Sequence, residues 1–118
     1  MTMTGIKRTV MGVLTVAVLM TAGQTAAAQS GTVSRVRGYQ TDTWSVWVSA
    51  GWHRVVVDGD GDTDLDLYVL DAAGRRLATD DDATDYCVGS FYMPRTGYIE
   101  IRIRNLGSVY NEYEITVS

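Results

Sequence analysis

Cysteine, proline and histidine each occur only once in this chain. Because Cys87 cannot form an internal disulfide, we expect it to be a buried small apolar residue, with a free or intermolecular thiol as the alternative. We expect His53 at the surface, since no serine or cysteine motif lies beside it. Aspartates on turns do not form the enclosed pocket that shifts a catalytic pKa. The composition therefore argues against an enzyme.

Long apolar runs are also missing. The longest, Val10–Met20, is shorter than the roughly 20 residues that a membrane-spanning helix needs. Lys7 and Arg8 precede this run and small residues follow it up to Ala28, a pattern typical of a secretory signal peptide. We predict a leader at residues 1–28 and a mature chain from Gln29 to Ser118. The protein is then exported to the periplasm or beyond, with no membrane insertion once the leader is removed.

Lysine is absent from the predicted mature chain, which carries eight arginines and all 14 acidic residues. The net charge is therefore near −6, and nucleic acid or an anionic membrane would not attract such a protein. The remaining length, about 90 residues, is enough for one modest hydrophobic core. We expect a single domain at residues 29–118, monomeric, with no nucleic-acid partner.

Helical spacing of apolar residues is absent, whereas alternation is common. In YIEIRIRN, Ile99, Ile101 and Ile103 alternate with polar residues, which is typical of an antiparallel strand with one wet face. Gly51 and Gly74 are placed for turns that need a positive φ. Short strands at this spacing predict an all-β fold, an antiparallel jelly-roll-like β-sandwich of about eight strands. The predicted strands are Val33–Tyr39, Thr43–Ser49, His53–Asp58, Leu65–Asp71, Arg75–Thr79, Val88–Met93, Tyr98–Asn105 and Tyr110–Val117.

Aspartates are crowded around one predicted hairpin. If Asp71–Arg75 is its turn, Leu70 lies near Leu77, and the aspartates on both strands approach one another. Like charges this close repel, and oxygen-only anionic ligands suit calcium. The alternative is that they are solvated turn residues, partly paired with Arg75 and Arg76. The predicted metal ligands are Asp64, Asp66, Asp80, Asp81 and Asp82, in preference to the earlier aspartates 58–62.

Aromatic residues give a second candidate site. In TWSVWVS, Trp44 alternates with Trp47, so one of the two tryptophans points away from the core. Tyr68 points outward beside Asp66 if the leucines of DLDLYV point inward. Exposed Trp47 and Tyr68 on a flat sheet face would suit a sugar or a protein chain. The alternative is that these rings cover sheet edges or fill a small core.

The order of these segments resembles the bacterial pre-peptidase C-terminal domain family, over nearly all of Arg37–Ser118. The most specific part is DLDLYVLDAAG at Asp64–Gly74 with the acidic loop that follows, and GYIEIRI matches a late strand of the family. The resemblance implies a jelly-roll-like sandwich without catalytic activity. In related collagenase domains it implies calcium and collagen binding.

These observations predict a secreted, non-catalytic binding or stabilising module, stabilised by calcium, with an unidentified protein or polysaccharide as its ligand. The alternative is a stand-alone carbohydrate- or extracellular-matrix-binding protein that uses an exposed aromatic sheet face.

Overall fold

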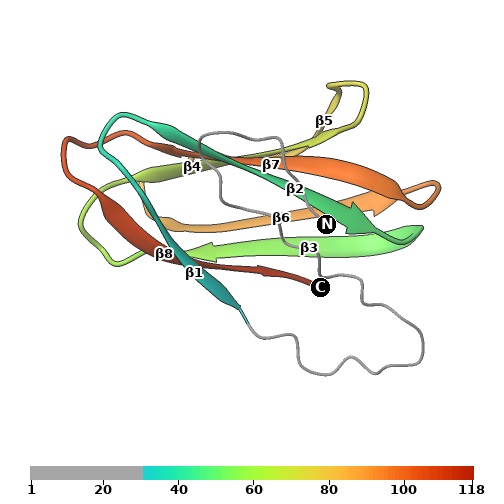
Figure 1. Ribbon diagram of the computed structural model, residues 1–118, viewed down its shortest axis with the longest axis horizontal. Coiled ribbons are helices and arrows are strands. Elements are labelled where there is room, and N and C mark those ends of the chain that lie inside the picture. The colour runs from blue at the N-terminus through green and yellow to red at the C-terminus, as the bar shows by residue number, and fades with distance from the viewer. Residues whose placement is uncertain (1–30) are drawn as a thin grey trace.

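Eight β-strands and no helix are formed by residues 31–118, the part of the chain that the computed structural model describes (Figure 1). The predicted leader, residues 1–28, lies outside the described residues. Within residues 31–118 no helix is long and apolar enough to cross a membrane. The strands are β1 (Thr32–Val36), β2 (Thr41–Val48), β3 (Gly51–Asp58), β4 (Leu65–Asp71), β5 (Arg76–Asp80), β6 (Tyr86–Met93), β7 (Gly97–Asn105) and β8 (Asn111–Val117).

The strands form two four-stranded sheets that face each other (Figure 1). Sheet A has the order β2-β7-β4-β5 and sheet B the order β1-β8-β3-β6. Every paired strand is antiparallel. Each connection except β4–β5 leads from one sheet to the other. The predicted all-β fold, an antiparallel β-sandwich of about eight strands, is confirmed.

The core lies between the sheets and is built by alternation within each strand. Ile99, Ile101 and Ile103 of β7 are buried, as predicted, while the residues between them face out. Of the two tryptophans of β2, Trp44 points into the core and Trp47 is exposed. The remaining core positions are contributed by every strand except β5, whose Leu77 and Ala78 pack at its border. Sheet pairing therefore follows the apolar pattern that the sequence shows.

Strand ends lie within three residues of the predicted ones, and β4 agrees at both ends. β1 ends at Val36 and not at Tyr39, because a turn begins at Arg37, whose carbonyl accepts from the Gln40 backbone, and Tyr39 within this turn has a left-handed φ of 60°.

The predicted β4–β5 register, with Leu70 near Leu77, holds from the Leu67–Asp80 pair to the Val69–Ala78 pair. A β-bulge between Val69 and Leu70 then places Leu70 opposite Arg76 next to the turn.

A buried hydrogen-bonded group connects the two sheets. The Trp44 indole of β2 donates to the Tyr113 hydroxyl of β8 at 2.8 Å. Tyr113 in turn donates to the Asp42 carboxylate at 2.6 Å. Burial and the Asp42 charge both raise the pKa of Tyr113. Because a buried carboxylate needs such donors, this group fixes the position of β2 against β8.

The connections gather at two opposite ends of the sandwich (Figure 1). We call one the loop end; it carries the β1–β2, β3–β4, β5–β6 and β7–β8 connections, residues 37–40, 59–64, 81–85 and 106–110. We call the other the turn end; it carries the β2–β3, β4–β5 and β6–β7 turns, residues 49–50, 72–75 and 94–96. The candidate sites described below lie at these ends and on the outer faces of the two sheets.

Candidate functional site

The β3–β4 loop is held by the buried side chain of Asn111. Its Oδ1 accepts a hydrogen bond from the Asp60 backbone at 3.0 Å, and its Nδ2 donates to Thr63 and to Asp85. Asp85 also accepts from the Gly61 backbone at 2.6 Å. The Asp60 carboxylate accepts hydrogen bonds from the backbone amides of Asp62 and Glu112. The Asp60 carboxylate therefore helps to shape this loop.

Two of the five predicted metal ligands have structural hydrogen bonds. Asp80, at the end of β5, accepts from the Val88 backbone of β6 at 2.8 Å. Asp82 accepts from the backbone and hydroxyl of Thr84 and closes a turn. Among residues 31–118, no group of three or more His, Cys, Asp and Glu side chains is arranged to hold a metal ion. The structure thus brings the hairpin aspartates near one another without assembling a complete site.

Asp64 and Asp66 differ from the other aspartates because each has a buried Oδ1 without a hydrogen-bond partner in the described part of the chain. Asp66 is only 8% exposed although it lies on the outer face of sheet A. Burial raises the pKa of both carboxyls. The charges of Asp66, Asp82 and Asp85 raise the pKa of Asp64 further. A cation or a proton would relieve this repulsion, so the donor chemistry of the pair fits calcium.

Of the two predicted ligand-binding aromatics, only Trp47 presents an accessible ring. Trp47 is 46% exposed and contacts Tyr98 of β7 edge-on, with ring centroids 4.8 Å apart. Tyr68 is half-buried, its hydroxyl donates to Asp66, and the Arg76 guanidinium lies 4.9 Å over its ring. The two rings share the outer face of sheet A but stand about four residues, or roughly 13 Å, apart along it.

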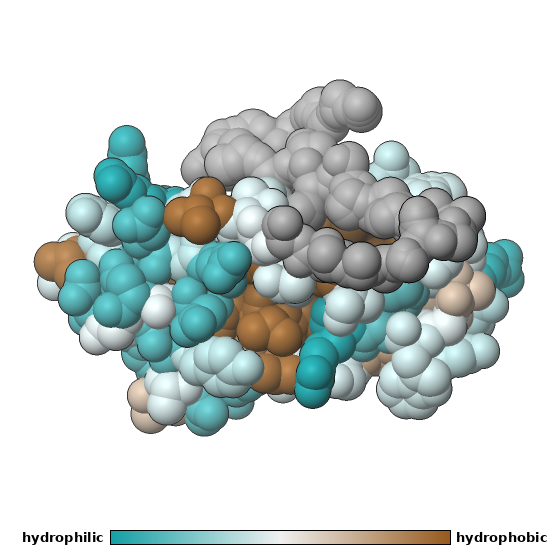
Figure 2. Space-filling view, turned by 90° about the horizontal axis from the view of Figure 1, so that it is seen from below, coloured by the Kyte–Doolittle hydropathy of each residue, from teal (hydrophilic) through white to brown (hydrophobic). Residues whose placement is uncertain are grey.

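A second exposed aromatic pair lies on the outer face of sheet B. Trp52 of β3 is 73% exposed and lies opposite Tyr92 of β6, with centroids 5.5 Å apart. Two rows further along the same strands, Val56 lies opposite Val88. Figure 2 views the side on which β3 and β8 lie in Figure 1 and shows hydrophobic side chains gathered near its middle. The sequence prediction missed this pair, because it began the strand at His53 and left Trp52 in a turn.

Exposed apolar side chains also gather at the loop end. Tyr39 is 68% exposed at the tip of the β1–β2 turn, and its backbone donates to Gly107 at 2.9 Å. The buried Asn105 holds both turns, because its Nδ2 donates to Val36 and Val109. We call the exposed residues of these two turns the loop-end patch: Tyr39, Leu106, Val109 and Tyr110. The left-handed φ of Tyr39, which only the structure shows, marks the patch as a preorganised surface.

His53 and Cys87 take no part in an arrangement for nucleophilic catalysis. His53 Nε2 lies 2.6 Å from the Ser49 carbonyl oxygen, and its Nδ1 lies 3.1 Å from the Ser118 backbone oxygen. Cys87 is fully buried, as predicted, and its Sγ donates to the Leu65 carbonyl. Burial raises the pKa of Cys87 to about 12, so it remains a thiol at neutral pH.

The fold defines a class of small all-β sandwiches. The chain is similar to the pre-peptidase C-terminal domain of a collagenase from Bacillus anthracis, with a TM-score of 0.60 at 14% identity over 75% of this chain and 90% of that domain. The resemblance stated from the sequence is confirmed at the level of the fold.

Two periplasmic inhibitors of g-type lysozyme have a similar fold. The Aeromonas hydrophila protein gives a TM-score of 0.56 at 17% identity, covering 91% of this chain and 98% of that one. The Salmonella Typhimurium protein gives a TM-score of 0.51 at 14% identity, covering 92% of this chain and 98% of that one. No protein-family model matches the sequence, and no curated protein matches it either. At these identities the likeness establishes a shared fold.

Proposed function

We propose that this protein is an exported, non-catalytic binding module that recognises a protein partner. The observation that carries the proposal is the loop-end patch, four exposed apolar side chains on two turns that hydrogen bonds hold together. Loop residues are ordinarily polar, and rigid exposed aromatic and aliphatic side chains are typical of interface centres. The carboxylates of Asp60 and Asp62 in the neighbouring β3–β4 loop form a charged rim, which favours a partner with basic residues.

The structural neighbours support a binding role. The periplasmic proteins described as inhibitors of g-type lysozyme act on a protein, and the other neighbour is a domain of a collagenase. Such a role also agrees with the predicted leader. g-Type lysozyme and collagen are therefore the first two probes to test.

Binding of the mature chain to immobilised g-type lysozyme and to collagen, followed by biolayer interferometry, tests the proposal. We expect one probe to bind, and Tyr39→Ala together with Val109→Ser to weaken binding at least about tenfold, the scale of a central interface residue. Trp47→Ala, on the sheet A face, serves as the matched control and should leave binding unchanged. Equal binding by the loop-end variant, or no binding to either probe, would contradict this assignment.

Carbohydrate binding is the second candidate function. It is favoured by the exposed Trp47–Tyr98 pair on a flat face beside polar Ser45 and Glu100, a combination that suits the apolar face and hydroxyls of a sugar. Affinity electrophoresis in gels that contain soluble polysaccharides tests this role. Retardation that is lost in Trp47→Ala supports it.

Calcium is proposed as a stabilising ion at the Asp64–Asp66 pair. The two unpartnered buried oxygens support this proposal, and Asp81 and Asp82 are the nearby carboxylates that add negative charge. A calcium ion there would neutralise the repelling carboxylates and order the β5–β6 connection.

A further inference from the structure

The charges of the described residues are separated between the two ends of the sandwich. The turn end and the adjoining half of the strands carry four arginines and two acidic residues, Asp71 and Glu100. The loop end and its half of the strands carry four arginines and twelve acidic residues. The turn end therefore has a positive net charge, although the net charge of the whole chain is negative.

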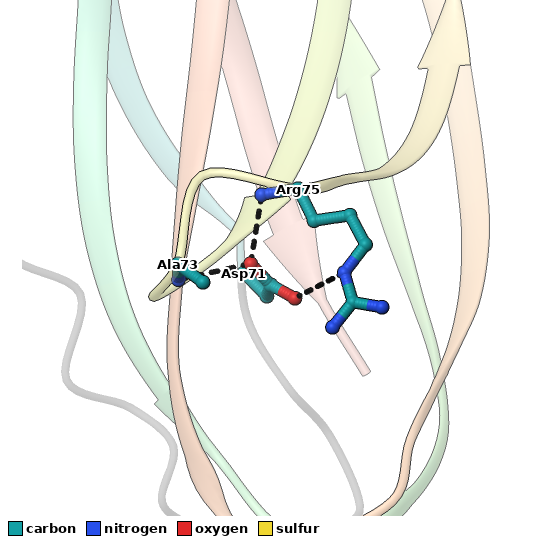
Figure 3. Close-up of polar contacts among 3 residues, drawn as sticks. All are labelled: Asp71, Ala73 and Arg75. Atoms are coloured by element: carbon teal, nitrogen blue, oxygen red, sulfur yellow. Dashed lines mark hydrogen bonds and ion pairs between the residues drawn. The ribbon is translucent and has the colours of Figure 1, made fainter.

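Two arginines are already paired: Arg75 at the turn end contacts Asp71 at 3.3 Å, and Arg102 near the middle of β7 contacts Glu100 at 2.8 Å. Figure 3 shows how Asp71 also accepts from the backbones of Ala73 and Arg75, which fixes the β4–β5 turn. Neither ion pair of residues 31–118 involves Arg54 or Arg95. These two guanidinium groups are therefore available to bind a ligand.

Arg54 and Arg95 flank the Trp52–Tyr92 pair. Arg54 is two residues from Trp52 on the same outward face of β3 and lies opposite Ser90. Arg95 follows Tyr92 by three residues, in the β6–β7 turn. We call this surface the Trp52 platform: Trp52, Arg54, Ser90, Tyr92 and Arg95. Along β3 the nearest acidic residue is Asp58, four residues beyond Arg54, which is about 13 Å away.

We infer that the Trp52 platform binds an acidic polysaccharide, a glycan whose sugars carry carboxylates. The apolar C–H face of a sugar ring stacks on an aromatic ring, and a carboxylate at its edge accepts paired hydrogen bonds from a guanidinium. The ligand thus satisfies both kinds of side chain on the platform. Aliphatic side chains, which a protein interface would bring to its centre, are absent from the platform itself and begin two rows away at Val56 and Val88.

The acidic loop end does not oppose this ligand. The strands between the two ends are up to nine residues long, so the ends are roughly 30 Å apart. Exposed charges are largely screened beyond about 8 Å at physiological ionic strength. A glycan at the platform therefore experiences mainly the field of Arg54 and Arg95.

The inference rests on the proposed binding function and adds a ligand class and a surface separate from the loop-end patch and from Trp47. Its test is isothermal titration of the mature chain with polygalacturonate and with the same polymer after methyl esterification. We expect binding to polygalacturonate that weakens as salt rises and is lost on esterification. Trp52→Ala should weaken it at least about tenfold, the scale of ring stacking.

Arg54→Gln with Arg95→Gln should also abolish the salt dependence, while Tyr86→Ala, an exposed tyrosine at the loop end of the same face of β6, leaves binding unchanged. Because all the substituted side chains are exposed or lie in turns, unchanged melting temperatures will confirm that the variants fold. Absence of binding to polygalacturonate, or equal binding by Trp52→Ala, overturns the inference. Equal binding of poly-glutamate overturns the glycan assignment in favour of an acidic protein ligand. Loss of protein binding in Tyr39→Ala with glycan binding intact separates this inference from the proposed protein-binding role.

Discussion

Leu67 shows how a single core residue determines which face of a strand is buried. It has no solvent exposure and lies in the central part of β4, whereas Glu100 faces outward in the adjoining β7. We predict that Leu67→Asp unfolds the domain, because an unpaired buried charge costs several kcal/mol against a total stability of about 5–15 kcal/mol. Thermal melting followed by circular dichroism is the measurement. Glu100→Gln is the control and should melt like the parent.

A second prediction at the residue scale concerns the effect of Asp66 on the melting temperature, measured in the absence of calcium. Burial raises the pKa of Asp66 above 3.8, its ordinary value. The native state then binds a proton more readily than the unfolded state, so stability from this group is present at low pH and is lost as pH rises through the native pKa. Asp66→Asn should therefore melt at a higher temperature than the parent at pH 7.

The advantage of Asp66→Asn should shrink on acidification towards pH 4, because the parent carboxyl becomes protonated there. Hydrogen bonds from the backbones of Arg75 and Ala73 lower the pKa of Asp71, which has the opposite effect on stability. Because Asp71 is present in both proteins, comparing the variant with the parent at each pH removes this effect. A variant that is less stable at pH 7, by an amount independent of pH, would show that the Asp66 charge is satisfied in the folded protein.

At the scale of elements, the β3–β4 loop depends on one side chain of another strand. Asn111 of β8 is fully buried and bonds to Asp60, Thr63 and Asp85. We predict that Asn111→Ala lowers the free energy of unfolding by about 1–3 kcal/mol per polar group left unpaired. Hydrogen exchange should accelerate in residues 59–64 before it does so in β4.

The control for Asn111→Ala is Asp62→Asn in the same loop, which keeps the bonds to Asn111 and should change the melting temperature little. Unchanged exchange in the Asn111→Ala loop would indicate that the loop is held mainly by its backbone contacts with the β5–β6 connection, such as Gly59 to Asp85.

Elements also show where prediction from sequence ends. All eight strands were predicted because alternation and turn residues are local signals. The bulge at Val69–Leu70 could not be predicted, because it depends on how β5 meets β4. The contact of Arg76 with the ring of Tyr68 likewise depends on the pairing of these two strands. Trp52 was missed for a similar reason, since only pairing with Tyr92 extends β3 back to Gly51.

At the scale of the whole molecule, we predict that calcium at a few millimolar raises the melting temperature by several degrees. Extracellular calcium sites commonly have dissociation constants of about 10⁻⁴–10⁻³ M, and occupancy at ten times that value adds about 1.4 kcal/mol. Magnesium should act much less, because it requires a tight octahedral set of ligands. Asp64→Asn with Asp66→Asn should remove the calcium-specific increment.

The calcium measurement needs sodium chloride at matched ionic strength as a control, because screening of clustered carboxylates also stabilises. Equal shifts with calcium, magnesium and sodium would show that the aspartates are a solvated acidic surface. Unequal shifts that persist in the double variant would place the ion elsewhere.

The sequence by itself determined the all-β class, the strands and the inward faces of β4 and β7, because a period of two and turn-forming residues act within a few positions of the chain. It also limited the chemistry, since one histidine and one cysteine leave few catalytic arrangements. Only the tertiary structure decided which residues meet. Asn111 reaches the β3–β4 loop, Tyr39 rests on the β7–β8 turn, and four of the arginines lie at the turn end. These contacts join positions far apart in the sequence. Strand pairing within each sheet and the packing of the two sheets, which no local pattern encodes, bring them together.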